Sequence, residues 1–178
     1  MLKRFLNIAA MFAIMASMVA IATARQSNVD NYRFTERIRK ELVKLPYYGV
    51  YDNLAFEVKG NDVILYGQVV RPSTRKEAER RIARIEGVDH VINRIQVLPP
   101  SSSDDAIRRR IYREVFRTGS LYRYAMGANP SIHIIVNHGH VTLEGVVSSQ
   151  MDSQLAYTAA NQVPGVFSVT NNLRVESR

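Results

Sequence analysis

Two groups of basic side chains are the residues whose type and spacing suggest the clearest binding chemistry. The first group comprises Arg75, Lys76, Arg80, Arg81 and Arg84. The second comprises Arg108, Arg109, Arg110, Arg113 and Arg117. On a helix that meets an anionic membrane, each such cation contributes about 1 kcal/mol before salt screening. Both groups are therefore candidates for binding an anionic surface such as phospholipid head groups.

Aromatic and apolar side chains accompany the second group and suit the same chemistry. They are Tyr112, Phe116, Leu121, Tyr122 and Tyr124. A tyrosine is apolar along its ring and polar at its tip, which fits the interface between water and hydrocarbon. We therefore add Tyr122 and Tyr124 to the candidate membrane-binding residues.

The alternative is that these arginines form only the solvated faces of amphipathic helices, offset in part by Glu77, Glu79 and Glu114. For each helix taken alone, this is the simpler interpretation. The concentration of charge favours binding, because a further predicted helix at residues 149–163 carries one acidic residue and no basic one.

The sequence contains no pattern of a catalytic or metal site. It has no nucleophile elbow, zincin motif or glycine-rich phosphate loop. His133, His138 and His140 lie close together in the chain, but there is no cysteine and no evident carboxylate near them. We expect turn and surface histidines, no cofactor and no enzymatic activity.

The first residues of the chain have the pattern of a secretory signal. Lys3 and Arg4 precede an apolar run from Phe5 to Ala22, and small residues end it at Ala24. We predict a signal peptide at residues 1–24, with an uncleaved membrane anchor as the alternative. The chain has no cysteine, which excludes lipoprotein attachment and disulfides. We therefore expect a periplasmic protein that is soluble or peripherally bound to a membrane.

The net charge bears on the partner. The 178 residues carry 24 basic and 16 acidic side chains, and removing Lys3 and Arg4 leaves a net charge of +6. Export takes nucleic acid out of ordinary reach, so anionic phospholipid, cell-wall polymer or an acidic envelope protein are the better partners.

An internal repeat organises the rest of the chain. A shift of 78 residues superposes Val58–Val97 on Val136–Val175 without a gap, and eleven of these 40 positions are identical. The shared residues include Gly67/Gly145, Gly87/Gly165 and Asn93/Asn171. Residues 99–103, which are rich in proline and serine, separate the copies. We therefore predict an N-terminal linker at 25–34, a first domain at 35–98, a linker at 99–103 and a second domain at 104–178.

The hydrophobic pattern predicts the same order of elements in both copies. In the first, Ile38, Leu42 and Leu45 mark a helix capped by Thr35, and Ala78, Ile82 and Ile85 mark a helix that ends at Gly87. Alternating residues predict a hairpin around residues 59–62 and a third strand around residues 91–97.

The order in each copy is αββαβ. A right-handed crossover makes the second and third strands parallel, whereas the hairpin is antiparallel. We expect an α+β protein of two tandem modules, each a three-stranded mixed sheet with two helices on one face.

Repeated glycine and asparagine residues have structural explanations. Gly67 and Gly145 stand where a core-facing side chain is expected, which suggests a helix crossing close to the sheet. Gly87 and Gly165 end the second helix of each copy. Asn93 and Asn171 recur within an apolar strand face, so we expect them to bond the backbone through their side chains.

Alternation also places apolar residues on the sheet face that the helices leave open. They are Ile64, Tyr66, Ile92, Ile135 and Val146. Such a patch usually marks an interface, so we expect contact between the modules, with a second copy or with an envelope protein.

The second copy carries an insertion centred on residues 117–130. Long loops often bear function, but a loop can also cover its own core. The sequence leaves both interpretations open.

The repeated motif resembles a known family. Both copies show V-x-L-x-G-x-V, a helix with Ala78 or Ala156, and then G-V-x-x-V-x-N-x-[IL]-x-V. This pattern is similar to the BON domain, found in tandem in osmotically induced periplasmic proteins. The resemblance implies an αββαβ fold, an envelope location, no catalytic residues and attachment to phospholipid membranes or envelope partners. It fixes no binding residues, because the motif consists mostly of glycine and core positions.

Overall fold

The computed structural model describes residues 31–127 and 129–176. The predicted signal peptide, residues 1–24, lies outside the described residues. The boundary between two compact units lies between Lys40 and Glu41. Within the described ranges, no helix is both long and apolar enough to cross a membrane.

Residues 31–43 are helical, so this helix includes residues that we expected in a linker. Thr35 does not cap it. The Thr35 hydroxyl instead donates to the carbonyl oxygens of Asn31 (3.0 Å) and Tyr32 (2.9 Å). The predicted cap is wrong because a threonine inside a helix can satisfy its hydroxyl on the preceding turn.

The first module contains one mixed sheet. Strands β1 (Asn53–Lys59) and β2 (Asp62–Val69) form the antiparallel hairpin, and α2 (Pro72–Ile82) follows. The chain then runs parallel to β2 as β3 (His90–Asn93) and β4 (Gln96–Val97). The predicted third strand is therefore present but interrupted between Asn93 and Gln96.

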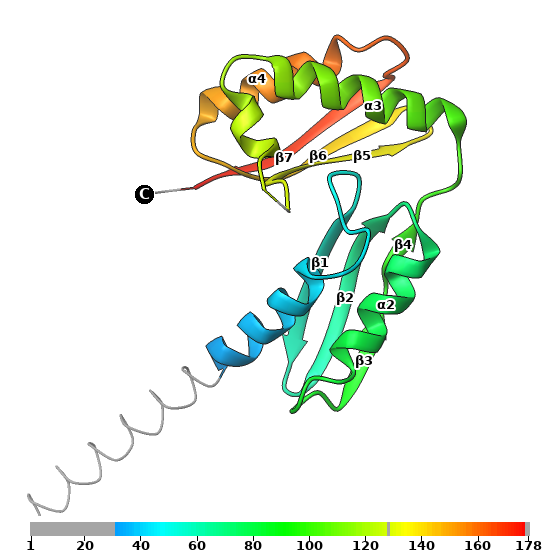
Figure 1. Cartoon of the computed structure of the whole chain (residues 1–178), viewed down its shortest axis with the longest axis vertical. Coiled ribbons are helices and arrows are strands. Elements are labelled where there is room, and N and C mark those ends of the chain that lie inside the picture. The colour runs from blue at the N-terminus through cyan, green and yellow to red at the C-terminus, as the bar shows by residue number, and fades with distance from the viewer. Residues whose placement is uncertain (1–30, 128, 177–178) are drawn as a thin grey trace, which may run out of the picture. The chain divides into compact units, whose positions relative to one another are not determined.

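The second module repeats this arrangement with a continuous last strand. Its elements are α3 (Ser102–Arg117), the 3₁₀ helix η1 (Leu121–Ala125), β5 (Ile132–Asn137), β6 (His140–Val147), α4 (Gln150–Asn161) and β7 (Ser168–Val175). Strands β5 and β6 are antiparallel, and β6 and β7 are parallel. Helices α3 and α4 lie on one face of the sheet (Figure 1). The predicted α+β fold of two αββαβ modules is confirmed.

The explanation predicted for Gly67 and Gly145 is wrong. A Cβ at Gly67 would lie 2.0 Å from the Asn53 carbonyl oxygen, and a Cβ at Gly145 would lie 1.9 Å from that of Ser131. Both glycines have φ above +110°, a conformation that L side chains rarely adopt. The close neighbour is backbone at the start of the adjacent strand, Asn53 of β1 or Ser131 directly before β5, rather than a helix.

The repeated asparagines bond backbone, as predicted. The Asn93 amide donates to the Arg75 carbonyl oxygen (3.1 Å), and the Asn171 amide donates to the Ser153 carbonyl oxygen (3.3 Å). Arg75 and Ser153 are themselves 78 residues apart. The repeat therefore preserves a bond between the last strand and the second helix of each module.

Candidate functional site

The helix that carries the second basic group is well specified by its sequence. The Ser101 side chain accepts a hydrogen bond from the Asp104 amide (3.1 Å), and Asp104 and Asp105 complement the positive end of the helix. Ile107, Ile111 and Val115 follow at intervals of four residues and are buried in the core of the second module. This spacing fixes which face of α3 is exposed.

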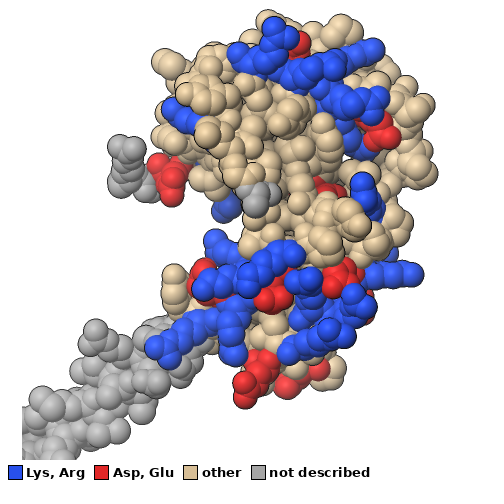
Figure 2. Space-filling model, in the orientation of Figure 1, with Lys and Arg blue, Asp and Glu red and all other residues tan. Residues whose placement is uncertain are grey.

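The exposed face of α3 carries a stripe of arginines. We define the α3 arginine stripe as Arg109, Arg110, Arg113 and Arg117, all of which are exposed. At 3.6 residues per turn, they fall within an arc of about 100° that is roughly opposite the core residues. Figure 2 shows Lys and Arg side chains gathered along this helix. Among residues 31–127 and 129–176, no ion pair involves the stripe.

Arg108, which was predicted to face the membrane, is buried. It is 2% exposed, and its guanidinium donates to the Asp105 carboxylate and to the Val136 carbonyl oxygen, both at 2.6 Å. The helical phase explains the error, because position 108 lies beside the core residues 107, 111 and 115. Arg108 holds α3 to the end of β5 and leaves the set of candidate membrane contacts.

The first basic group is partly neutralised by its own helix. Arg81 is half-buried and pairs with Glu77 (3.0 Å) and Glu41 (3.5 Å), and Arg80 also pairs with Glu77. The hydrogen bond from Arg81, followed by that from Arg80, lowers the pKa of Glu77. The predicted offset by Glu77 is therefore present.

The other members of the first group are exposed. They are Arg75, Lys76 and Arg84. Lys76 and Arg80 are one turn apart on one face of α2, whereas Arg75 is the neighbour of Lys76 and Arg84 lies two residues beyond the end of the helix at Ile82. This group is the second candidate for anion binding, with less net charge than the α3 arginine stripe.

The insertion in the second module covers its own core. Leu121 is fully buried and Tyr124 is 7% exposed, and both belong to the core cluster. Tyr124 is therefore not available for the membrane contact that we predicted. Tyr122 of η1 is 60% exposed, and Met126, directly after η1, is 68% exposed.

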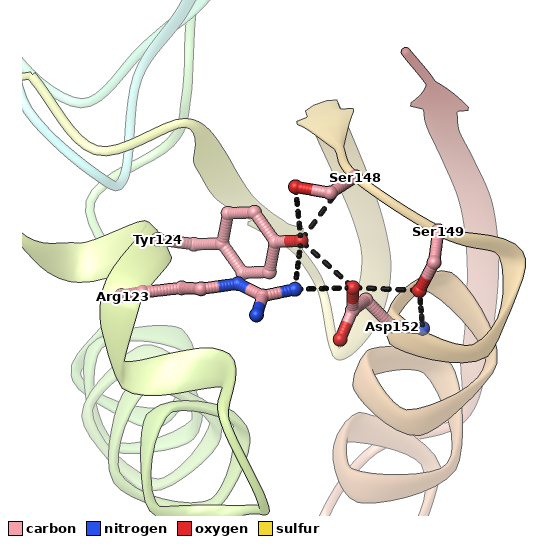
Figure 3. A network of polar contacts seen from close by, with 5 residues as sticks. All are labelled: Arg123, Tyr124, Ser148, Ser149 and Asp152. Carbon is pink, nitrogen blue, oxygen red and sulfur yellow. Dashed lines mark hydrogen bonds and ion pairs between the residues drawn. The ribbon is translucent and has the colours of Figure 1, made fainter. Parts of the chain in front are cut away.

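A polar network fixes η1 to the start of α4 (Figure 3). The Tyr124 hydroxyl lies 2.8 Å from the Asp152 carboxylate and accepts from the Ser148 amide at 2.8 Å. The same carboxylate accepts from the Ser149 hydroxyl (2.7 Å) and from Arg123 (2.6 Å). These bonds, led by that from Ser149, lower the pKa of Asp152.

Sequence reasoning missed this network, although part of its signal was visible. Ser149 caps α4 by accepting from the Asp152 amide (3.1 Å), and the spacing Ser-x-x-Asp resembles a capping box. The contribution of Arg123 and Tyr124, almost thirty residues earlier in the chain, had no local signal.

The three histidines do not behave alike. His138 and His140 are exposed, as predicted, but His133 is buried beside the Tyr48 ring, with 5.5 Å between ring centroids. Its Nδ1 lies 3.2 Å from the Gly49 carbonyl oxygen, and burial lowers its pKa. No group of three or more metal-ligating side chains occurs within the described residues.

The candidate interface residues on the open sheet faces have different exposures. Ile64 and Ile135 are buried, Tyr66 and Val146 are half-buried, and Ile92 is 42% exposed. Ile135 lines a cavity of about 270 Å³ together with Gln68, Gln96 and Leu98 of the first module. The structure therefore does not bring these five residues into one surface.

A segment of the first module also meets the edge of β5, which the sequence did not reveal. The Ile134 amide donates to the Val50 carbonyl oxygen (2.7 Å). Val50 and Tyr51 pack against the core cluster of the second module, and the Tyr51 ring contacts the Tyr112 ring edge-on at 6.4 Å.

Comparisons with known proteins find one family. The family model of the BON domain matches residues 33–99 and 103–177. A search of the curated proteins found no match. One similar solved structure is of CdsD, a structural protein of the type III secretion system of Chlamydia trachomatis, at 9% identity and a TM-score of 0.32, covering 80% of this chain and 91% of that chain. Another is the C-terminal domain of CdsD, at 9% identity and a TM-score of 0.28, covering 80% of this chain and 96% of that chain. At these scores neither likeness bears on function.

Proposed function

The chain belongs to the BON domain family, and from this membership we propose that it is a non-enzymatic protein of the bacterial envelope that binds anionic phospholipid surfaces reversibly and so supports envelope integrity. BON domains occur in envelope proteins, and the family is generally non-enzymatic. The lipid, the binding residues and the periplasmic location are the parts that we propose.

The observation that carries the proposal is the α3 arginine stripe. Four arginines lie on one exposed face, and no described acidic side chain pairs with them. At about 1 kcal/mol for each cation, they provide about 4 kcal/mol before salt screening. That energy corresponds to a dissociation constant of about 1 mM. Binding through this surface is therefore reversible and sensitive to salt.

Co-sedimentation with phospholipid vesicles tests the proposal. We expect the chain without residues 1–24 to sediment with anionic vesicles at low salt, less at moderate salt, and not with zwitterionic vesicles. Replacing Arg109, Arg110, Arg113 and Arg117 by serine is expected to weaken binding at least about tenfold.

The matched control removes the same charge from α2 and the turn that follows it. In this variant Arg75, Lys76, Arg80 and Arg84 are replaced by serine, and we expect a smaller loss because Glu77 already offsets part of that charge. Equal losses in the two variants would show that net charge, rather than the α3 arginine stripe, drives binding. Absence of binding by the unmodified protein to anionic vesicles would refute the proposal.

The proposed location has its own test. We propose that residues 1–24 direct export and are removed. N-terminal sequencing of the protein from a periplasmic extract is expected to begin at Arg25. Recovery of the chain from the cytoplasm with its first residues intact would contradict this location.

A second candidate function is self-association through the open sheet face of the first module. The observation that favours it is Ile92, 42% exposed beside the half-buried Tyr66. The Tyr66 hydroxyl bonds Glu57 (3.1 Å), so the tyrosine is held on this face. Sedimentation equilibrium is expected to show a mass that rises with concentration and that Tyr66→Glu reduces to that of a monomer. A strict monomer in the unmodified protein would eliminate this candidate.

A further inference from the structure

The short helix η1 presents two exposed side chains of interfacial character. Tyr122 is 60% exposed and Met126, directly after the helix, is 68% exposed. They belong to the insertion by which the second module differs from the first. Single exposed apolar residues are common on proteins, so their setting must decide whether they have a role.

The setting is rigid. On the inner side of η1, Leu121 and Tyr124 are buried in the core of the second module. The Tyr124 hydroxyl and Arg123 are bonded to the Asp152 carboxylate at 2.8 Å and 2.6 Å, as Figure 3 shows. These contacts fix the inner side of η1 to the core of the second module, whereas Tyr122 and Met126 remain exposed.

The setting is also positively charged. Arg117, the last member of the α3 arginine stripe, is exposed and precedes Leu121 by four residues. Helix η1 packs against α3. The cations attract an anionic surface, whereas the tyrosine ring and the thioether are suited to the layer just beneath its charges.

We infer that Tyr122 and Met126 form an insertion tip, which enters the interfacial layer of an anionic bilayer while the α3 arginine stripe contacts the head groups. This inference rests on the proposed phospholipid binding and identifies the part of the surface that leaves water. Interfacial segments of this kind reach about 5–10 Å into the boundary between head groups and acyl chains.

Met151 provides a matched control. It is 72% exposed, as much as Met126, but it lies on α4, which has no lysine or arginine. If exposure alone caused insertion, the two methionines would behave alike. If the charged setting matters, only Met126 enters the bilayer.

The experiment uses tryptophan as a depth probe, which the chain permits because it contains none. Met126→Trp and Met151→Trp are each mixed with anionic vesicles whose acyl chains carry bromine. With Met126→Trp we expect a blue-shifted emission and quenching by bromine, and with Met151→Trp neither change. Circular dichroism confirms that both variants fold.

The outcomes separate the inference from the proposed function, because co-sedimentation is measured on the same samples. If the protein sediments with the vesicles but Met126→Trp is not quenched, or Met151→Trp is quenched equally, the insertion tip is wrong and the phospholipid binding stands. If neither variant nor the unmodified protein sediments, both are wrong.

A second measurement avoids the affinity that tryptophan itself adds for membranes. Replacing Tyr122 and Met126 together by serine is expected to weaken vesicle binding at least about fivefold and to leave its salt dependence intact. Met151→Ser is expected to have no effect. Unchanged binding by the double variant would overturn the inference.

Discussion

At the scale of single residues, the two strand glycines show how the backbone limits the sequence. Gly67 and Gly145 occupy equivalent positions, and a Cβ there would lie 2.0 Å or 1.9 Å from a backbone carbonyl oxygen, which is too close for any side chain. Both also lie in the left-handed region of backbone space. The glycines in the family motif are therefore required by the hairpin itself.

Gly67→Ala is expected to destabilise the protein by at least about 2 kcal/mol, because the strained backbone alone costs about 1–3 kcal/mol and the contact with Asn53 adds to it. Urea unfolding followed by circular dichroism measures the effect. Gly49→Ala is the control, because nothing lies within 4 Å of its Cβ position and its φ is not positive. A loss below about 1 kcal/mol for Gly67→Ala would show that the strand shifts to accommodate the methyl group.

His133 makes stability depend on pH. Burial lowers its pKa below the ordinary value of 6.5, so the folded state favours the neutral ring. The contribution of His133 to the free energy of unfolding is fully present above pH 6.5. It declines as the pH falls from 6.5 towards the pKa that His133 has in the folded state. The urea midpoint is therefore expected to fall more between about pH 7.5 and about pH 5.5 in the unmodified protein than in His133→Gln.

The difference in urea midpoint between the unmodified protein and His133→Gln reports the effect of His133 alone. Asp52 faces His133 and has a pKa raised by burial, which gives stability the opposite dependence on pH, and Glu144 is also near. Both carboxylates are present in both proteins, so their effects cancel in the difference. Equal shifts of the midpoint would indicate that His133 is not responsible.

At the scale of elements, periodicity predicted the type and order of the helices and strands. The fold follows from local patterns, because each strand alternates and each helix buries a stripe. The helical period also indicates that Arg108 is buried, since position 108 borders the core stripe of α3. Its charge alone had suggested that it is exposed. Tyr124 was different, because its burial depends on tertiary contacts with the core of the second module and with Asp152, which no local pattern predicts.

Tyr124→Phe tests what the polar network contributes to η1. The hydroxyl bonds Ser148 and Asp152, so its removal is expected to cost about 1–3 kcal/mol while the ring keeps its place in the core. Tyr122→Phe is the control, because that tyrosine is 60% exposed. Thermal unfolding measures both. Equal stability of the two variants would mean that burial of the Tyr124 ring, and not its hydroxyl, holds the insertion.

At the scale of the whole molecule, the two copies also satisfy one equivalent backbone amide with different side chains. The amide just before α2, that of Val70, donates to the Asp52 carboxylate at 2.7 Å. The equivalent amide before α4, that of Ser148, donates to the Tyr124 hydroxyl at 2.8 Å. Asp52 also bonds the Gly49 amide (3.2 Å) and so shapes the segment that meets β5. A comparison of the two copies by residue identity misses this equivalence, because an aspartate accepts the hydrogen bond in one copy and a tyrosine accepts it in the other.

The contact of Tyr51 with the second module predicts cooperative unfolding. Because Tyr51 packs against that module's core and its ring meets Tyr112, we expect the unmodified protein to unfold in one calorimetric transition with equal van't Hoff and calorimetric enthalpies. Tyr51→Ala is expected to broaden or split the transition, since each small module alone buries only about 60% of its unfolded surface. Tyr47→Ala serves as the control, because Tyr47 is 68% exposed and stacks with Arg71 of its own module. Two separate transitions in the unmodified protein would show that Tyr51 does not couple the modules, whereas a split confined to Tyr51→Ala would identify this side chain as the link.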